Sequence, residues 1–260
     1  MIDRVLAPVY YAYEKMLERQ VRSSPLPTHV GLILDGNRRF AKAKGEDPKI
    51  GHYYGLLTAR KLITWAMELQ VPALTLFVMS ADNFNRSPEE VGNLVKLLVS
   101  ETTRMKEDPR LVEHKVRVRA IGRRDLYPAE LAASLTALET ATAHHGGMVI
   151  QIAVGYGGRE EIVDAVKRSA QAKATQGVSL EQFATTFVAK DIDDHLYTAG
   201  VPDPDFIIRT SGEERISGFL LWQAAYSELY FTDVFWPAFR RLDFLRALRN
   251  FQGRQRRFGK

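Results

Sequence analysis

The sequence HVGLILDGNRRF, residues 29–40, provides the first evidence for the fold. Its apolar run at residues 29–34 is typical of a buried strand, and Asp35, Gly36 and Asn37 follow directly, before two arginines that open a helix. Ligands of open α/β sheets bind beyond the carboxyl ends of strands, and the first turn of a helix favours anions. The stretch therefore indicates either a site for an anion, with or without Mg²⁺, or a turn that only caps a helix.

Strand-like and helical stretches alternate along most of the chain. Further apolar runs occur at residues 73–79, 116–121, 148–154 and 205–210, and helical apolar spacing occupies residues 53–69, 88–105, 128–144 and 159–172. Continuous apolar strands separated by helices are typical of a parallel sheet that is covered on both faces. We expect an α/β fold, in which a single domain of residues 1–260 contains a central, mostly parallel β-sheet flanked by helices.

Two terminal segments lie outside this alternation. The first is an N-terminal helical extension, residues 1–22, with one apolar face. This face would pack on the domain or contact a membrane surface. Its residues are Val5, Val9, Tyr13, Met16 and Leu17. Residues 239–260 are predicted to form a basic C-terminal helix whose arginines could contact diphosphate or anionic lipid. Its apolar stripe predicts docking on the protein and consists of Phe244, Leu245, Leu248 and Phe251.

Composition excludes several classes of protein. The chain has 260 residues, of which 45% are hydrophobic, and a net charge of +5. Residues 240–260 hold eight basic residues and one acidic residue, so the other 239 residues sum to −2. A nucleic-acid partner would need a broad basic face, which this distribution does not favour. The absence of cysteine excludes disulfides and thiolate chemistry.

Hydropathy points to a cytoplasmic protein. No apolar run reaches the roughly 20 residues that span a bilayer, and charged residues interrupt the N-terminal stretch where a signal peptide would be apolar. We expect at most peripheral association with the inner face of the membrane.

Two further polar clusters follow predicted strands. In MSADNFNRSPEE, residues 79–90, the side chains of Ser80, Asp82, Asn83 and Arg86 could reach the same crevice as Asp35. In the segment at residues 206–233, Arg209 and Arg215 could grip a diphosphate, because guanidinium forks match phosphate oxygens. Surface arginines are commonly only solvated, but three such clusters at strand ends together favour a crevice that binds anions.

Several motifs now carry a family resemblance. DGNRR, the GHYYG stretch at residues 51–55, SADNFNR, GYGGREEIVDA at residues 155–165 and IRTSGEERISGFLLWQAAYSELYFTD resemble the cis-prenyltransferases, the undecaprenyl diphosphate synthase-like enzymes. The resemblance covers residues 29–258. It implies a homodimeric, Mg²⁺-dependent enzyme that transfers an allylic prenyl group onto isopentenyl diphosphate and forms a Z double bond.

The resemblance also implies roles for individual residues. Asp35 matches an aspartate that helps to hold Mg²⁺ and the diphosphates, and Asn83 matches part of the proton-removing apparatus. Glu228 matches a second carboxylate of the Mg²⁺ site, which the neighbouring subunit supplies in some family models. Positions that match substrate-binding residues are Gly36, Asn37, Arg38, Arg39, Phe40, His52, Ser80, Ala81, Asp82, Phe84, Arg86, Arg209, Arg215, Ile216 and Ser217.

Departures from the long-chain pattern suggest a short product. Val78 stands where long-chain enzymes usually carry Ala, and Met79 stands for Phe, in a strand that lines the family's product tunnel. Extra volume there would shorten the product. Together with an N-terminal stretch similar to that of actinobacterial short-chain members, this favours (2Z,6E)-farnesyl diphosphate made from geranyl diphosphate. Pro48 stands where many members carry an arginine that contacts diphosphate.

Two alternatives to this function stay open. The chain could be a medium- or long-chain polyprenyl diphosphate synthase of the undecaprenyl or decaprenyl type. It could also be a non-catalytic partner subunit, although such subunits lose catalytic motifs and this chain keeps Asp35, Asn83 and Arg209.

Overall fold

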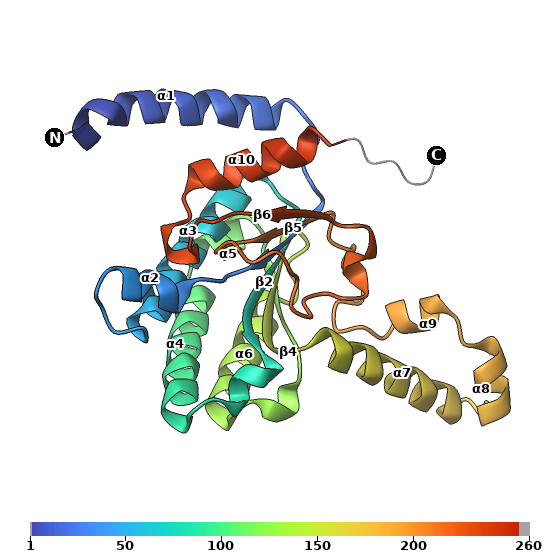
Figure 1. Ribbon diagram of the computed structural model, residues 1–260. Coiled ribbons are helices and arrows are strands. Elements are labelled where there is room, and N and C mark those ends of the chain that lie inside the picture. The colour runs from blue at the N-terminus through green and yellow to red at the C-terminus, as the bar shows by residue number, and fades with distance from the viewer. Residues whose placement is uncertain (1, 255–260) are drawn as a thin grey trace. The chain divides into compact units, whose positions relative to one another are not determined.

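The computed structural model describes the backbone of residues 2–254 and the side chains of residues 10–254 (Figure 1). The strands are hydrogen-bonded in the order β3-β4-β2-β1-β5-β6, and the pairs β1–β5, β5–β6 and β3–β4 are parallel. The predicted α/β fold with a parallel sheet is confirmed. The strands are β1 (His29–Ile33), β2 (Ala73–Ser80), β3 (Arg117–Ile121), β4 (Val149–Tyr156), β5 (Phe206–Arg209) and β6 (Glu228–Phe231).

Helices occupy the stretches in which helical spacing was expected. Each of the four predicted internal helices is present, with bounds that differ by a few residues. The helices are α1 (Ile2–Arg22), α2 (Asn37–Ala43), α3 (Ile50–Leu69), α4 (Pro88–Lys106), α5 (Pro109–Glu113), α6 (Ala129–Thr142), α7 (Gly158–Thr175), α8 (Leu180–Thr186), α9 (Ala189–Asp193) and α10 (Arg241–Gln252).

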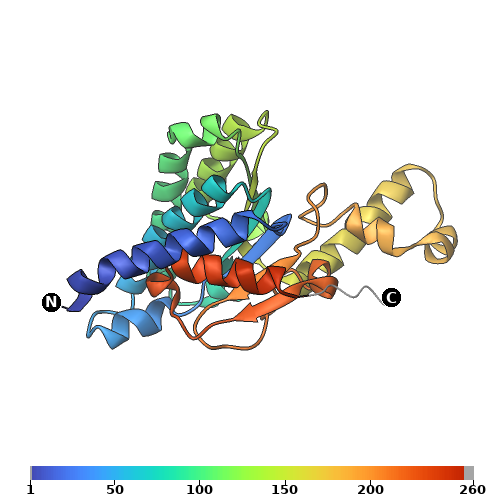
Figure 2. The same cartoon turned by 90° about the horizontal axis from the view of Figure 1, so that it is seen from above.

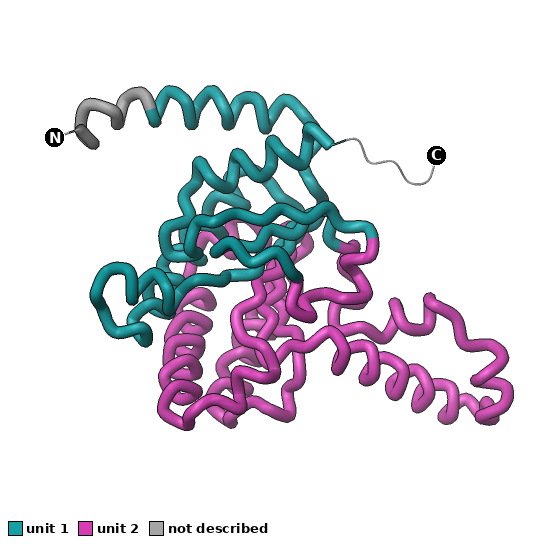
Figure 3. Tube along the Cα trace, in the orientation of Figure 1, with its two compact units in different colours: residues 1–74, 204–215, 226–260 teal, residues 75–203, 216–225 magenta. Residues whose placement is uncertain are grey.

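The chain divides into two compact units (Figure 3). Unit 1 contains residues 1–74, 204–215 and 226–260, and unit 2 contains residues 75–203 and 216–225. Each unit is assembled from separate stretches of sequence, so neither is a continuous segment. The sequence pattern, which indicates one domain, does not anticipate this division.

In unit 1, the C-terminal helix α10 docks on the protein as predicted. Phe244, Leu245 and Leu248 are fully buried, and the ring of Phe251 lies 5.2 Å from that of Phe206 between centroids. Helix α1 lies alongside α10 (Figures 1 and 2). This burial supports the prediction of a docked C-terminal helix.

The face of α1 is only partly the one predicted. Leu17 is fully buried and Tyr13 lies under the guanidinium of Arg246, 5.6 Å from its ring centroid. Met16, however, is 46% exposed, so the protein does not cover this part of the predicted face. The side chains of Val5 and Val9 lie outside the described residues. Packing on α10 therefore accounts for Leu17 and Tyr13, and contact of this helix with a membrane surface remains a prediction.

The arginines of α10 are largely committed within the protein. The half-buried side chain of Arg241 forms ion pairs with Glu14 at 3.2 Å, Glu18 at 3.0 Å and Glu68 at 3.1 Å. This network joins α10 to α1 and α3. The expectation that the C-terminal arginines contact diphosphate or lipid is therefore wrong for Arg241.

The Glu18–Arg241 pair makes stability dependent on pH. A hydrogen bond from Arg241 is the main cause that lowers the pKa of Glu18 to about 2. Because the pKa in the folded chain lies below its ordinary value, the stabilisation is present above about pH 4.5 and is lost as pH falls toward 2. We expect E18Q to flatten the acid limb of the unfolding free energy by at most about 1.4 kcal/mol per pH unit. Urea denaturation at several pH values measures this, and an unchanged limb would contradict it.

In unit 2, aromatic rings and a buried carboxylate organise the core. The rings of Phe77 and Phe219 stack with centroids 5.0 Å apart. Glu161, fully buried in α7, accepts hydrogen bonds from the hydroxyl of Tyr156, from Gln223 Nε2 at 3.1 Å and from the backbone N–H of Tyr197 at 2.8 Å. The GYGGREEIVDA motif thus joins three stretches of unit 2.

None of the helices in the described part of the chain has both the length and the hydropathy of a membrane-spanning segment.

Candidate active site

Asp35 lies just beyond the end of β1, and its backbone is held on both sides. Its N–H donates to Thr210 Oγ1 at 3.0 Å, and its carbonyl oxygen accepts from Thr210 Oγ1 at 2.7 Å and from the N–H of Trp236 at 2.9 Å. In the parallel pairing of β1 with β5, Ile33 and Arg209 are the last residues of their strands and stand opposite each other. The residues that follow the two strands therefore leave the sheet at the same edge, side by side. Strand pairing therefore brings two predicted clusters together, although they are more than 170 residues apart in sequence.

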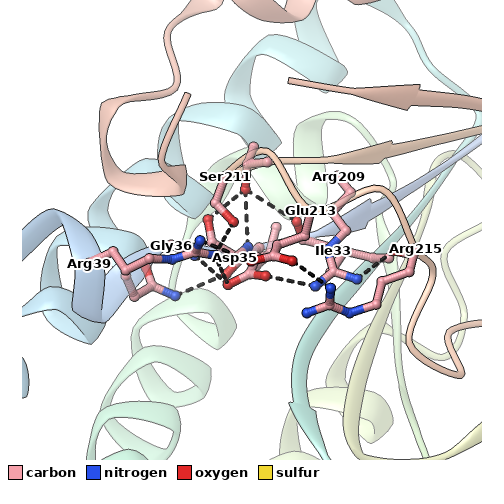
Figure 4. Close-up of polar contacts among 11 residues, drawn as sticks. Ile33, Asp35, Gly36, Arg39, Arg209, Ser211, Glu213 and Arg215 are labelled. Atoms are coloured by element: carbon pink, nitrogen blue, oxygen red, sulfur yellow. Dashed lines mark hydrogen bonds and ion pairs between the residues drawn. The ribbon is translucent and has the colours of Figure 1, made fainter. Parts of the chain in front are cut away.

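The Asp35 carboxylate is held by three donors (Figure 4). Oδ1 accepts from the N–H of Gly36 at 2.6 Å and faces Arg39 Nη2 at 3.4 Å, while Oδ2 accepts from Arg209 Nη2 at 2.8 Å. Burial, the largest influence on the group, acts to raise the pKa of Asp35. The hydrogen bond and positive charge of Arg209, helped by Gly36 and Arg39, outweigh it and hold the pKa below its ordinary value. Asp35 is therefore a carboxylate at neutral pH.

Three arginines and two carboxylates alternate around this point (Figure 4). Arg209, with a side chain only 5% exposed, also donates from Nη1 to the backbone oxygen of Arg215. Arg39 donates to Ser211 Oγ at 2.6 Å and to Glu213 Oε1 at 3.0 Å, and Arg215 pairs with the other oxygen of Glu213. Guanidinium forks at such a point can exchange these partners for the oxygens of a diphosphate.

Glycine is required where the loop after β1 approaches its neighbours. Gly36 has a φ of +103°, and a Cβ there would lie 2.9 Å from both Phe235 Cδ1 and Ser211 Cβ. The GHYYG motif serves the same packing, because a Cβ on Gly55 would lie 2.1 Å from Asn37 Oδ1. Its Gly55 carbonyl also accepts from Trp236 Nε1 at 2.9 Å.

The other predicted residues of unit 1 surround this cluster. Asn37 begins α2 and donates to the carbonyl of Leu34 at 3.0 Å. Arg38 is exposed on α2, and the ring of Phe40 packs edge-on against that of Tyr54 at 5.7 Å. His52 is half-buried near the start of α3. Their predicted contacts with substrate remain predictions.

The SADNFNR cluster belongs to unit 2, where it forms the 3₁₀ turn η1 (Ala81–Asn85) after β2. Asn83 Oδ1 accepts from the N–H of Ser80 at 3.1 Å, which closes the turn. Arg86 pairs with Glu90 at 2.8 Å, and the ring of Phe84 stacks on that of Tyr127 with centroids 6.4 Å apart. Half-buried Ala81 and exposed Asp82 lie between these positions.

Ile216 and Ser217 begin the second stretch of unit 2, directly after Arg215. Ile216 is half-buried, and Ser217 is exposed with a φ of +48°. The convergence of these residues and of the η1 cluster with Asp35 remains a prediction.

The two predicted chain-length residues point to opposite faces of β2. Successive side chains of a strand alternate, so Val78 shares a face with Ser80, while Met79 shares one with Phe77. Met79 is 1% exposed, and Phe77 stacks in the core of unit 2. Val78 is half-buried. Only Val78 therefore keeps a position on the face of Ser80, and the role predicted for Met79 is not supported.

Glu228 does not lie beside Asp35 within one chain. It begins β6 opposite Phe206, the first residue of β5, whereas Asp35 follows the other end of the neighbouring strand β1. At about 3.3 Å per residue, this places the two carboxylates at opposite ends of the strands. Glu228 instead pairs with Arg254 at 2.6 Å. The prediction of a shared metal site for these two residues is thus wrong for a single chain.

The sequence pattern predicts Arg209 and Arg215 as site residues but not the residues between them. Thr210, Ser211 and Glu213 position Asp35 and Arg39. The signal was present, because these residues lie in the quoted loop RTSGEER between two selected arginines.

Comparison with known proteins decides the family. Residues 33–259 match the family model Prenyltransf, described as "Putative undecaprenyl diphosphate synthase". The chain belongs to this prenyltransferase family. The prenyltransferase is 54% identical to an isoprenyl transferase of Thermus thermophilus, with 100% of both chains covered.

Two other relatives have different named products. The prenyltransferase is 47% identical to the (2Z,6E)-farnesyl diphosphate synthase of Thermobifida fusca, with 97% of each chain covered. It is 46% identical to a geranylgeranyl-diphosphate-specific tritrans,polycis-undecaprenyl-diphosphate synthase of Methanocaldococcus jannaschii, with 95% of this chain and 88% of the relative covered. Overall identity therefore does not determine the length of the product.

A solved structure supports the fold. The lavandulyl diphosphate synthase of Lavandula x intermedia, in complex with dimethylallyl diphosphate, superimposes with a TM-score of 0.84 at 33% identity. The comparison covers 90% of the prenyltransferase and 99% of that chain.

Proposed function

We propose that the protein condenses isopentenyl diphosphate with an allylic diphosphate and forms a Z double bond. The observation that carries this proposal is the Asp35 carboxylate, held ionised between Arg39 and Arg209 at the end of β1. The cluster combines charge that can grip a diphosphate with a carboxylate that suits a divalent cation.

In this reaction the C1–O bond of the allylic diphosphate breaks, and C4 of isopentenyl diphosphate bonds to C1. A proton then leaves C2 of the isopentenyl unit, and inorganic diphosphate is released. Arg39 would stabilise the negative charge that grows on the leaving diphosphate, while Arg209 and Arg215 would hold the diphosphate of isopentenyl diphosphate. Two bound diphosphates would also hold the reacting carbons in one orientation.

We assign the final proton to the departing diphosphate. The Asn83 amide is not a strong base, and its Oδ1 already accepts the N–H of Ser80. Asp35 is a poor acceptor because its neighbours hold its pKa below the ordinary range. Asn83 would instead orient the isopentenyl group.

The residues present fit Mg²⁺. No group of three or more His, Asp or Glu side chains within the described residues could hold a metal by itself. Magnesium, however, usually takes one or two carboxylates together with substrate phosphate oxygens, and Asp35 supplies such a carboxylate. When bound, the ion would neutralise charge on the diphosphates. Glu228 would join the site only from a second copy in a homodimer.

Product analysis tests this function. The purified protein is incubated with Mg²⁺, isopentenyl diphosphate and dimethylallyl, geranyl or farnesyl diphosphate, and the dephosphorylated products are identified. We expect a product with a new Z double bond from at least one primer, and none in a matched reaction with excess chelator. A chain inactive with every primer would be better explained as a non-catalytic partner subunit.

We further propose a short product, (2Z,6E)-farnesyl diphosphate from geranyl diphosphate. The support is Val78, which shares the face of Ser80 on β2 and adds volume relative to Ala. We expect V78A to shift the product distribution toward longer chains by one or more isoprene units. Met79→Leu, on the opposite face, serves as the control and should leave the distribution unchanged. An unaltered distribution in V78A would make the volume argument wrong.

A further inference from the structure

Unit 2 contains a cavity of about 470 Å³ along the edge strand β3. Its walls come from β3, α6, α7 and the segment that follows α9. The volume lies within the range of small-ligand sites, roughly 300–1,000 Å³. The charged and aromatic lining residues are Arg117, Arg119, Arg124, Arg168, Glu139 and Tyr197. None of them belongs to the Asp35 cluster, and we call this space the β3 cavity.

Glu139, the acidic residue of the lining, already accepts hydrogen bonds from the protein with both of its carboxylate oxygens. Its Oε1 accepts from the backbone N–H of Ala120 at 2.8 Å and so covers part of the exposed edge of β3. Both of its oxygens accept from Arg124 Nη2, at 2.7 and 2.8 Å. Glu139 therefore balances Arg124 and leaves three lining arginines without a carboxylate from the cavity wall.

Two of these arginines are not neutralised by a carboxylate. Arg119 has only neutral hydrogen-bond partners, and Arg168 has one N–H donor group without a partner among the described residues. Arg119 donates to the carbonyl oxygens of Ala199 at 2.9 Å and Tyr197 at 3.0 Å, neither of which carries a charge. Arg168 lies over the ring of Tyr197, 4.7 Å from its centroid, and its Nε donates to the carbonyl of Asp164 at 3.3 Å. Its Nη2 is buried and makes no hydrogen bond among the described residues. A buried donor without a partner is costly, and an anion could satisfy it.

The third arginine, Arg117, is exposed at the start of β3 and forms no ion pair with the described part of the chain. Burial, followed by repulsion from Arg117, lowers the pKa of Arg119. Repulsion of this kind is relieved when a negative charge enters. The wall thus combines unbalanced positive charge, an unused buried donor and space for a ligand.

We infer that the β3 cavity binds a compact multivalent oxyanion of the phosphate class, such as inorganic diphosphate. Guanidinium groups on β3 and α7 would hold it from two sides, since their forks match phosphate oxygens. The larger apolar residues of the wall, Val118, Ile121 and Leu196, are at most 5% exposed, so the surface offered to a ligand is mainly polar. This favours the free anion over a prenyl diphosphate, whose hydrocarbon tail would need an apolar channel.

Calorimetric titration of the full-length protein tests this inference, with inorganic diphosphate as the probe and without an allylic substrate. We expect two classes of site in the unaltered protein. R117Q/R168Q should weaken one class by about tenfold to a hundredfold, because charge-assisted hydrogen bonds are lost. R39Q should weaken the other class, at Asp35. K167Q, which removes a neighbouring exposed charge on α7, should retain both classes.

The outcomes separate the ligand from its alternatives. Since Arg168 packs on Tyr197, thermal unfolding of R117Q/R168Q is recorded as well, and R117Q alone should still weaken the site by about tenfold if the double variant unfolds. If R117Q/R168Q and R117Q bind diphosphate with unaltered stoichiometry and affinity, the β3 cavity is not a diphosphate site. In a parallel titration, geranyl diphosphate should respond to R39Q alone. A comparable loss of geranyl diphosphate binding in R117Q would overturn the preference for the free anion.

Discussion

D35N should reduce the rate of prenyl transfer by at least about a thousandfold while the chain remains folded. The substitution keeps the size of the side chain but removes its negative charge. The site would lose the carboxylate proposed to hold Mg²⁺, and Arg209 would lose its ionic partner at 2.8 Å. Steady-state rates with isopentenyl diphosphate and the best primer, at saturating Mg²⁺, measure the effect.

The same variant should also be less stable. Losing a hydrogen bond between charged groups in this half-buried position costs about 2 kcal/mol of unfolding free energy, while Arg209 keeps its bond to the carbonyl of Arg215. Asp125, exposed and paired with Arg123, offers a matched control. D125N should alter neither rate nor stability appreciably. More than a tenth of the original rate in D35N would show that the Asp35 charge is not needed.

G36A should be the second damaging change, because it strains both the backbone and its surroundings. A residue with a Cβ disfavours the φ of +103° at Gly36, and the new atom would meet Phe235 Cδ1 and Ser211 Cβ at 2.9 Å. The left-handed backbone costs roughly 1–2 kcal/mol and overpacking about 1–3 kcal/mol, so we expect G36A to lose about 2–5 kcal/mol of unfolding free energy.

The prenyl-transfer rate of G36A should also fall by about a hundredfold, because the Gly36 N–H that donates to Asp35 Oδ1 would move. Gly45 provides the control, because its φ is +74° but a Cβ there would meet nothing within 4 Å. G45A should therefore cost only about 1 kcal/mol and leave the rate unchanged. Equal losses in the two variants, by urea denaturation, would show that the contacts with Phe235 and Ser211 do not matter.

Local sequence patterns predicted most of the strands but not the last one. The runs that form β1, β2 and β4 are continuous and apolar because they are buried on both sides, and this makes them visible in sequence. Strand β6 has four half-buried residues and lies within a longer apolar stretch, so no periodicity separates it. Without β6, the end of the sheet at which Glu228 stands could not be foreseen.

The site residues likewise differ in whether local sequence predicts their role or only tertiary contacts reveal it. The strand-end position of Asp35 followed from the apolar run before it, whereas its contact with Arg209 required the β1–β5 register. Ser211 and Glu213 have no pattern of their own, because their role depends on the position of Arg39. The chain-length role predicted for Met79 is not supported, because alternation along β2 assigns this side chain to the core once the face of Ser80 is known.

The sequence by itself determined the α/β class, the strand-end location of Asp35 and the family motifs, because burial and turn formation are local demands on residue type. The tertiary structure decided which distant residues meet. It joined Asp35 to Arg209, separated Glu228 from both, and surrounded the β3 cavity with arginines from β3 and α7. These outcomes depend on strand register and helix packing, which arise from contacts between residues far apart in the chain.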